Sequence, residues 1–198
     1  MKVIHYFDDN WLIFKTKDKM IIEKCDNQLQ DYHIKNLDSY STYITKIIKK
    51  NRLLSLINSE LTVIVPAIYL ESHENNIYNI FDKVGFNKIN IVNELTIIKP
   101  TKRESIVKIN TTNLTYYYKD NNKLKYKHLN YSSFIEKNES NIIKIISEFN
   151  KHFKINKTVL FGNYLNLIEL AAKIESNIKD KVYVQDNNKI YLINLFNF

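Results

Sequence analysis

The sequence has 198 residues, of which 44% are hydrophobic, and this composition is typical of a globular chain with one domain or two small ones. Its single cysteine, Cys25, excludes an internal disulfide, and its two glycines leave almost none for phosphate-binding loops. The formal net charge is +8 and is carried almost wholly by lysine. Because specific nucleic-acid sites favour arginine, we interpret the lysine excess as the mark of an AT-rich genome and expect no nucleic-acid partner.

The chain lacks the usual signals for export, membrane insertion and metal binding. Its first residues, MKVIHYFDDNW, have no long apolar core, and no apolar run reaches membrane-spanning length. The five histidines are scattered singly, without the spacing of a metal site. We therefore expect a cytoplasmic protein with no transmembrane segment, no bound metal and no cofactor.

The first half of the chain begins with three strand-like runs, KVIHYF, WLIFKTK and KMIIEKC, joined by short polar turns, the first at residues 8–10. From about Leu37 the apolar period becomes that of a helix, for which Asp38 or Ser39 is the expected N-cap. LTVIVP then predicts a buried strand, and a second helix is expected to end at Gly85. KINIV closes the unit as a further strand.

The same order of patterns restarts after residue 100. SIVKIN, LTYYYKD and KLKYKHL predict three strands, with turns at residues 111–113 and 121–122. A helix is expected from about Glu139, followed by the strand TVLF, another helix and the strand KVYV. The C-terminal run NKIYLINLFNF is expected to pack against this second half.

In each predicted helix, apolar residues at helical spacing mark the face expected to pack on the sheet. In the first half these residues are Tyr40, Tyr43, Ile44, Ile47 and Ile48, then Leu70, His73, Ile77, Phe81 and Val84. In the second half they are Ile142, Ile145, Ile146, Phe149 and Phe153, then Leu167, Leu170, Ala171, Ile174 and Ile178.

Both halves therefore predict the element order β-β-β-α-β-α-β, in domains 1–100 and 101–198. A repeat of this length indicates a duplicated domain and not a solenoid. Three antiparallel strands followed by alternating helices and parallel strands build a mixed α/β sheet with helices on its faces.

This tandem order resembles the actin, Hsp70 and sugar-kinase superfamily, in which each half carries a ribonuclease H-like core. Within it, the chain is most similar to the bacterial actins of the rod-shape, division and pilus-assembly types. The segments LTVIVPAIY, DKVGFNKINIVNE with Glu94, and TVLFGNYLNLIELAAKIESNIKDKVYV carry the resemblance. No insertion interrupts either half, so the resemblance implies an actin-like core without the outer subdomains that overhang the nucleotide cleft.

The resemblance also implies where a nucleotide cleft would lie. The positions that match the family's first phosphate loop, second phosphate loop and adenosine-side turn are Asp8, Asp9 and Asn10, then Thr111, Thr112 and Asn113, then Gly162 and Asn163. The family carries glycines in all three and an aspartate in the second loop. Here only Gly162 remains, and Asn110 begins the second loop.

We interpret these loops as degenerate, with no catalytic residue. Backbone N–H groups must approach phosphate oxygens closely, and glycine permits that approach because it has no Cβ. Residues 8–10 are more simply read as a hairpin turn. A ribonuclease H-like nuclease would need an acid at the end of the fourth strand of a half, where Pro66 and Gly162 stand instead.

Three functions remain open from the sequence. The leading hypothesis is a catalytically inactive actin-like scaffold in cell division, cell shape or pilus assembly. Its partner would be another actin-like or morphogenetic protein, or a second copy of the chain. The first alternative is a nucleotide-dependent actin-like filament former. The second is a lysine-rich nucleic-acid-binding protein, for which the cue is exposure of Tyr116, Tyr117, Tyr118 and Tyr126.

Overall fold

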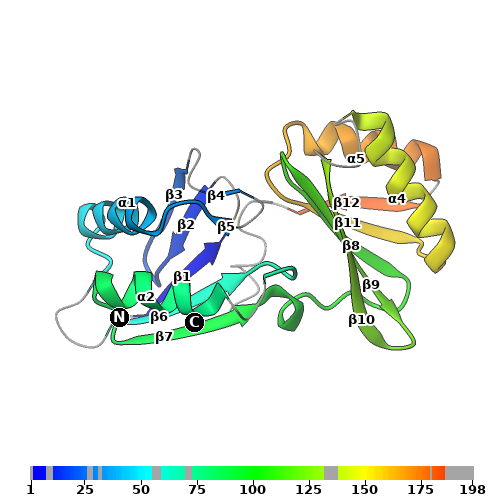
Figure 1. Ribbon diagram of the computed structural model, residues 1–198. Coiled ribbons are helices and arrows are strands. Elements are labelled where there is room, and N and C mark those ends of the chain that lie inside the picture. The colour runs from blue at the N-terminus through cyan, green and yellow to red at the C-terminus, as the bar shows by residue number, and fades with distance from the viewer. Residues whose placement is uncertain are drawn as a thin grey trace. The chain divides into compact units, whose positions relative to one another are not determined.

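A computed structural model of the chain describes residues 2–7, 11–25, 29–30, 33–54, 59–69, 73–131, 138–178 and 180–185 (Figure 1). The chain divides into two compact units, and the division falls between Ile97 and Ile98. Within the described ranges, no helix is long and apolar enough to cross a membrane.

The first unit contains a five-stranded sheet, a short hairpin and two α-helices among its described residues. Its elements are β1 (Lys2–Phe7), β2 (Trp11–Lys15), β3 (Met20–Lys24), β4 (Leu29–Gln30), β5 (His33–Ile34), α1 (Leu37–Lys50), β6 (Glu60–Val65), α2 (Glu74–Val84), β7 (Lys88–Asn93) and the 3-10 turn η2 (Glu94–Thr96). The predicted order is confirmed, and the hairpin β4–β5 is an addition that the sequence patterns did not indicate.

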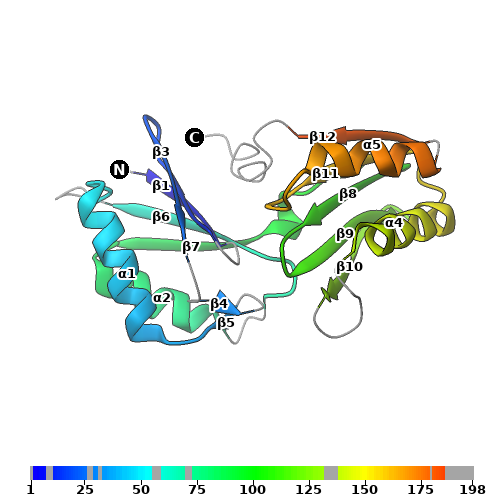
Figure 2. The ribbon, with the colours of Figure 1, turned by 90° about the horizontal axis from the view of Figure 1, so that it is seen from above.

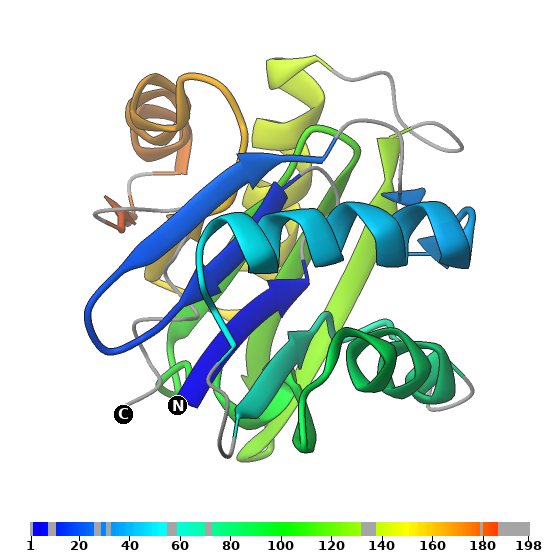
Figure 3. The ribbon, with the colours of Figure 1, turned by 90° about the vertical axis from the view of Figure 1, so that its left-hand side faces the viewer.

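The sheet of the first unit has the strand order β3-β2-β1-β6-β7. Strands β1, β2 and β3 pair antiparallel, whereas β6 is parallel to both β1 and β7. Parallel neighbours need a crossover connection, which α1 and α2 supply. Both helices pack into one core with the same face of the sheet, and α1 passes in front of the strands in Figure 3.

The second unit repeats this topology with the strand order β10-β9-β8-β11-β12. Its elements are β8 (Glu104–Ile109), β9 (Asn113–Asp120), β10 (Lys123–Asn130), α4 (Glu139–Phe153), β11 (Lys157–Phe161), α5 (Leu167–Ile178) and β12 (Lys181–Val184). Strand β11 is parallel to β8 and to β12, and α4 and α5 lie side by side over the strands in Figure 2. The predicted duplication is therefore confirmed.

The predicted inner faces of the helices are largely confirmed. The residues that are buried from those faces are Tyr40, Ile44, Ile47 and Ile48, then Ile77, Phe81 and Val84, then Ile142 and Ile146, then Leu167, Leu170, Ala171 and Ile174. Gly85 ends α2 in a left-handed conformation with φ of 109°, as its C-cap position predicts.

Local details differ from the sequence prediction. The N-cap of α1 is Asn36, whose Oδ1 accepts from the N–H of Ser39 at 2.9 Å, and it is neither Asp38 nor Ser39. His73 precedes α2 at the N-cap position, where its ring meets the ring of Tyr69 edge-on at 5.4 Å. The turn at residues 8–10 and the packing of the C-terminal run lie outside the described residues.

The tyrosines that would mark a nucleic-acid-binding surface are mostly buried, which is a correction to that alternative. Tyr116, Tyr117 and Tyr118 all lie in the core, and only Tyr126 is partly exposed. Tyr116 and Tyr118 fill space between the sheet and its helices, whereas Tyr117 lies on the opposite face of β9, beside Tyr126. Tyr118 stacks on Phe153 with ring centroids 3.8 Å apart.

A buried polar residue, Asn150, fixes α4 on its sheet and was missed by the apolar pattern. Its Oδ1 accepts from the Tyr116 hydroxyl at 2.6 Å, and its Nδ2 donates to Thr158 Oγ1 at 2.9 Å. Thr158 Oγ1 also lies 3.0 Å from Ser105 Oγ. Each polar atom of this cluster is paired, so burial of the amide costs little and the register of α4 is specified.

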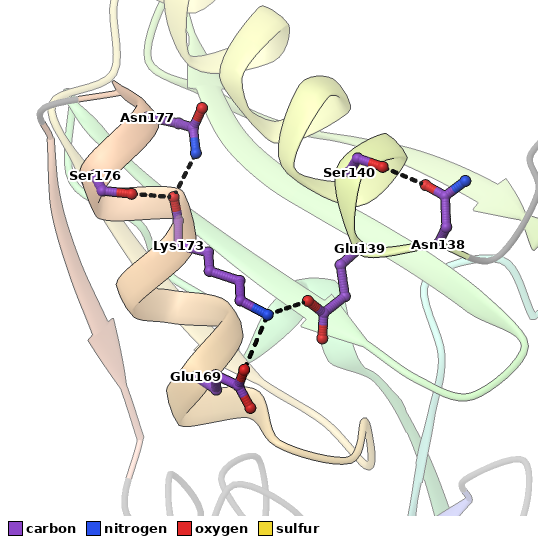
Figure 4. A network of polar contacts seen from close by, with 7 residues as sticks. All are labelled: Asn138, Glu139, Ser140, Glu169, Lys173, Ser176 and Asn177. Atoms are coloured by element: carbon purple, nitrogen blue, oxygen red, sulfur yellow. Dashed lines mark hydrogen bonds and ion pairs between the residues drawn. The ribbon is translucent and has the colours of Figure 1, made fainter.

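An ion-pair network joins the start of α4 to the middle of α5 (Figure 4). Lys173 Nζ lies 2.5 Å from Glu139 Oε2 and 2.9 Å from Glu169 Oε1. Hydrogen bonds to Glu139 and then Glu169 raise the pKa of Lys173 above its usual value. Because all three side chains are partly exposed, the network adds modestly to stability and mainly fixes the approach of the two helices.

The first prediction concerns the inner face of α5. Ile174→Asp places an unpaired carboxylate in the core and should lower the free energy of unfolding by about 3–5 kcal/mol. Ile168→Asp is the matched control, because Ile168 lies on the same helix but is 76% exposed. It should change stability by less than about 0.5 kcal/mol. Urea unfolding measures both, and equal stabilities would show that the register of α5 is wrong.

The second prediction concerns pH and His5, which lies on β1 with its ring stacked on Phe14 at 4.3 Å. Its Nδ1 donates to the Ile13 carbonyl at 3.1 Å. Burial lowers the pKa of His5 from 6.5 to about 4, against a smaller opposing effect of that hydrogen bond. Between pH 6.5 and about 4, His5 is therefore mostly protonated in the unfolded chain and mostly neutral in the folded chain.

The stabilisation from neutral His5 is complete above pH 6.5 and is lost progressively as the pH falls toward 4. Between pH 7 and pH 4.5 it should contribute a loss of about 2–3 kcal/mol in the free energy of unfolding. His5→Phe removes the titrating group, so that variant should lose correspondingly less over the same range. Parallel pH profiles for the two proteins would contradict the assignment.

Candidate functional site

The candidate site lies at the C-terminal ends of β8 and β11 in the second sheet, and we call this end of the sheet its carboxyl edge. These strands are parallel neighbours, with Phe161 paired to Lys108, so their carboxyl ends meet at one edge. In open α/β sheets this edge is where ligands bind. The structure brings together there the five sequence-predicted residues of this half, Thr111, Thr112, Asn113, Gly162 and Asn163, whereas Asp8, Asp9 and Asn10 lie outside the described residues.

Two asparagine side chains join the two turns at this edge. The N–H of Thr111 donates to Asn163 Oδ1 at 2.9 Å, and the N–H of Asn163 donates to Asn110 Oδ1 at 3.4 Å. Asn110 and Asn163 are both buried. We call this pair of reciprocal contacts the asparagine lock. In the lock, side-chain oxygens accept hydrogen bonds from the backbone N–H groups of Thr111 and Asn163. In a phosphate-binding loop, such N–H groups would instead donate to the ligand.

Other backbone groups of these turns are also satisfied within the unit. The N–H of Asn110 donates to the carbonyl of Asn113 at 2.8 Å, and the N–H of Tyr164 donates to the carbonyl of Ile109 at 3.1 Å. The Thr112 carbonyl accepts from the N–H of Tyr131 at 2.9 Å. These hydrogen bonds tie the turns to the strands and to each other.

Gly162 has a packing role that needs no ligand. Its φ is 127°, and a Cβ built on it would lie 2.2 Å from the carbonyl oxygen of Ile109. The backbone of the β11 turn thus lies against the end of β8 at a distance that only glycine allows. The one glycine left from the expected adenosine-side turn is explained by this close approach.

The charge at this edge also differs from that of a metal–nucleotide site. Asn110 is neutral at the position where the sequence resemblance implies an aspartate, and a carboxamide does not supply the charge that Mg²⁺ needs. Among the described residues, no three His, Cys, Asp or Glu side chains come together to hold a metal ion. Lys108, only 1% exposed, lies one residue before the end of β8.

Lys108 and the asparagine lock were both missed in the sequence. A lysine bracketed by Val107 and Ile109 in an apolar strand was the available signal for a buried cation. The lock had no local signal, because Asn110 and Asn163 are 53 residues apart and meet only through the pairing of β8 and β11.

The corresponding edge of the first unit is closed by a glutamate. Glu94 is buried, and its Oε1 accepts from the N–H of Ala67 at 2.7 Å. Asn93 Nδ2 donates to the Pro66 carbonyl at 3.3 Å. In both units, therefore, a polar side chain caps the turn that follows the fourth strand of the repeat, and Glu94 serves as such a cap.

Two repeats of three antiparallel strands and two parallel strands, each with two crossover helices, define the actin-like fold, and this chain has it. No protein-family model matches the chain, and no curated protein sequence matches it either. The fold is nonetheless plain from solved structures.

The ethanolamine utilization protein EutJ from Carboxydothermus hydrogenoformans is similar over 99% of this chain and 89% of its own, at 12% identity and a TM-score of 0.73. MreB5 of Spiroplasma citri, in its ADP-bound structure, is similar over 98% of this chain and 94% of its own, at 8% identity and a TM-score of 0.61. A chain of the PilM–PilN type IV pilus biogenesis complex covers 93% of this chain and 88% of its own, at 8% identity and a TM-score of 0.65. The TM-scores establish a shared fold, and at identities this low they establish nothing about function, which depends on the particular site.

The third prediction tests the close approach at Gly162. Gly162→Ala drives a Cβ into the Ile109 carbonyl and should lower the free energy of unfolding by several kcal/mol, more than about 3. Gly85→Ala is the matched control: its φ is also positive, but the nearest atom to an added Cβ is 3.7 Å away. That variant should lose only about 1–2 kcal/mol from backbone strain. Equal losses in urea unfolding would refute the packing role of Gly162.

Proposed function

We propose that this protein is a catalytically inactive member of the actin-like fold class that works as a scaffold by binding other proteins. The observation that carries the proposal is the asparagine lock. The N–H groups of Thr111 and Asn163 already bind Asn163 and Asn110 side-chain oxygens, so they are not available to phosphate oxygens.

Phosphate binding at this edge would have to break the lock first. Each lost hydrogen bond costs about 0.5–1.5 kcal/mol, and each buried carboxamide left unpaired costs about 1–3 kcal/mol more. A phosphate would then meet Asn110 in place of a metal-binding aspartate. These costs favour a closed turn that serves structure, and they support the absence of ATP hydrolysis.

Structurally similar proteins bind other proteins or assemble into filaments, and this supports a protein partner. PilM is found in a complex with PilN, and MamK forms a double helical filament. The turn before α5 and the first turn of that helix expose Leu165 (79%) and Ile168 (76%), two apolar side chains that a partner surface would cover. We propose that the partner is another actin-like or morphogenetic protein, or a second copy of this chain, in cell division, cell shape or pilus assembly.

We also infer a cytoplasmic location, because the single cysteine is free and buried and the chain holds no disulfide.

A nucleotide-dependent filament former is the second candidate. MreB5 of Spiroplasma citri is bound to ADP in one structure and to AMPPNP in another. In this chain such a site would depend on residues 8–10 for its phosphate contacts, since the asparagine lock occupies the other loop. Nucleic-acid binding is not favoured, because Tyr116, Tyr117 and Tyr118 are buried.

The fourth prediction separates these candidates by ligand-induced stabilisation. A nucleotide at 100 times its dissociation constant would add about 2.7 kcal/mol to the free energy of unfolding. We expect no change in melting temperature with millimolar ATP, ADP or GTP in the presence of Mg²⁺, and no release of phosphate from ATP. Replacing Asp8 and Asp9 together by asparagine should leave partner capture from the native cells unchanged.

The decisive contrary result would be a clear ATP-dependent rise in melting temperature that Asp8→Asn abolishes. It would replace the scaffold by the nucleotide-dependent filament former.

A further inference from the structure

A cavity of about 590 Å³ lies at the opposite end of the second sheet from the asparagine lock. Three segments line it: the residues that precede β8, the β9–β10 turn and the C-terminal end of α4. Four cationic residues are among those that line it, namely Lys102, Arg103, Lys119 and Lys154. Arg103 is one of only two arginines in the chain.

These four cations have no acidic partner among the described residues, although the cavity contains a carboxylate. Asp120 is that carboxylate, and its Oδ2 is taken by Lys125 Nζ at 2.6 Å. Two further lysines of the unit do have acidic partners: Lys157 Nζ lies 2.5 Å from Glu104 Oε1, and Lys173 contacts Glu139 and Glu169. Positive charge is therefore left uncompensated at this cavity and is available to an anionic ligand.

The walls of the cavity are held by backbone contacts, so the cations are presented on a fixed frame. The Arg103 carbonyl accepts from the N–H groups of Asn156 at 3.0 Å and Lys157 at 3.3 Å. Lys154 ends α4 in a left-handed conformation with φ of 54°. Phe153, stacked on Tyr118, provides an apolar surface between the charges. Preorganised walls reduce the entropy that a ligand must lose on binding.

The positive surface continues from the cavity along β10. This strand is an edge strand of the described sheet, and it begins directly after Asn122, which lines the cavity. Lys123, Lys125 and Lys127 are exposed and alternate with other residues, so their side chains emerge on one face. Lys125 pairs in register with Tyr118, whose ring contacts Phe153, so this is the face on which α4 packs.

The spacing of these charges indicates an extended ligand. Lys123 and Lys127 are four residues apart on a strand, which corresponds to about 13 Å at 3.3 Å per residue. A single phosphate group can meet only one or two cations over such a length, whereas carboxylates repeated along a peptide can meet several. The mixture of spaced lysines, one arginine and an apolar ring suits an acidic peptide.

We propose that this cavity and the adjoining lysines of β10 bind an extended, aspartate- and glutamate-rich segment of a protein partner. The inference rests on the proposed function, because it names the chemistry of the partner that the scaffold would bind. It assigns binding to the far end of the second sheet, away from the degenerate nucleotide-cleft positions.

The test uses a fluorescein-labelled twelve-residue peptide in which six glutamates alternate with serines, and its glutamine counterpart as a neutral probe. Fluorescence anisotropy should show binding of the acidic peptide only, weakening as NaCl rises from 50 to 300 mM. Lys119→Glu with Lys154→Glu should weaken binding at least tenfold. Lys17→Glu with Lys46→Glu, two exposed lysines of the first unit, should weaken it less than threefold.

The two double variants carry the same change of charge. Each reversal of a lysine subtracts two charges, so both lower the formal net charge from +8 to +4. Equal weakening by both would show that only the overall charge attracts the peptide and would overturn the proposal. Tighter binding of a single-stranded oligonucleotide with six phosphates, lost in the cavity variant, would also overturn it and make the cavity a nucleic-acid site. If Lys119→Glu with Lys154→Glu fails to fold, Lys102→Glu with Arg103→Glu replaces it with the same change of charge.

The outcome is independent of the nucleotide experiment. Absence of peptide binding together with absence of an ATP effect would reject this inference and leave the scaffold proposal standing. Peptide binding together with an Asp8-dependent ATP effect would support the cavity and reject the inactive scaffold.

Discussion

The parallel pairing of the first and fourth strands of each repeat is the constraint on which the rest of the structure depends. β1 with β6, and β8 with β11, run in the same direction, so each pair needs a crossover, and α1 and α4 are those crossovers. The pairing also brings the ends of β8 and β11 to one edge. Every contact of the asparagine lock is a consequence of that register.

The lock shows how turns at this end of the sheet can be closed without glycine-rich loops. A phosphate loop leaves backbone N–H groups unpaired until a ligand arrives, which is a cost to the free protein. Here asparagine side chains supply the oxygens from within the chain, and Gly162 stands where the backbone of Ile109 leaves no room for a Cβ. The first unit reaches the same result with Glu94 and the N–H of Ala67.

The two ends of the second sheet thus differ in whether their polar and charged groups are paired within the protein. At the end of β8 the polar groups are satisfied by one another, and the edge is closed. At the start of β8 the cations Lys102, Arg103, Lys119 and Lys154 face a cavity without described acidic partners. The binding proposed above belongs to this second end of the sheet.

The sequence by itself determined the elements and their order. Periods of two and of 3.6 residues are local properties, so the strands, the helices, the buried faces of α1 and α5 and the C-cap at Gly85 followed from short windows. The duplicated order then implied a mixed sheet with helices on its faces in each half. The N-cap prediction of Asp38 or Ser39 was wrong, because several neighbouring polar side chains can cap a helix and the backbone geometry selects Asn36.

Only the tertiary structure decided what surrounds each polar residue. Asn110 meets Asn163, and Tyr116 meets Asn150, across 53 and 34 residues of chain, and nothing in either neighbourhood of the sequence specifies the other partner. The burial of Tyr116, Tyr117 and Tyr118 and the convergence of three segments on the cationic cavity arise in the same way. The hydrophobic period depends on neighbours along the chain and can be read from short windows. Hydrogen-bond pairing and charge compensation depend on strand register and helix packing, which are fixed only when the whole unit folds.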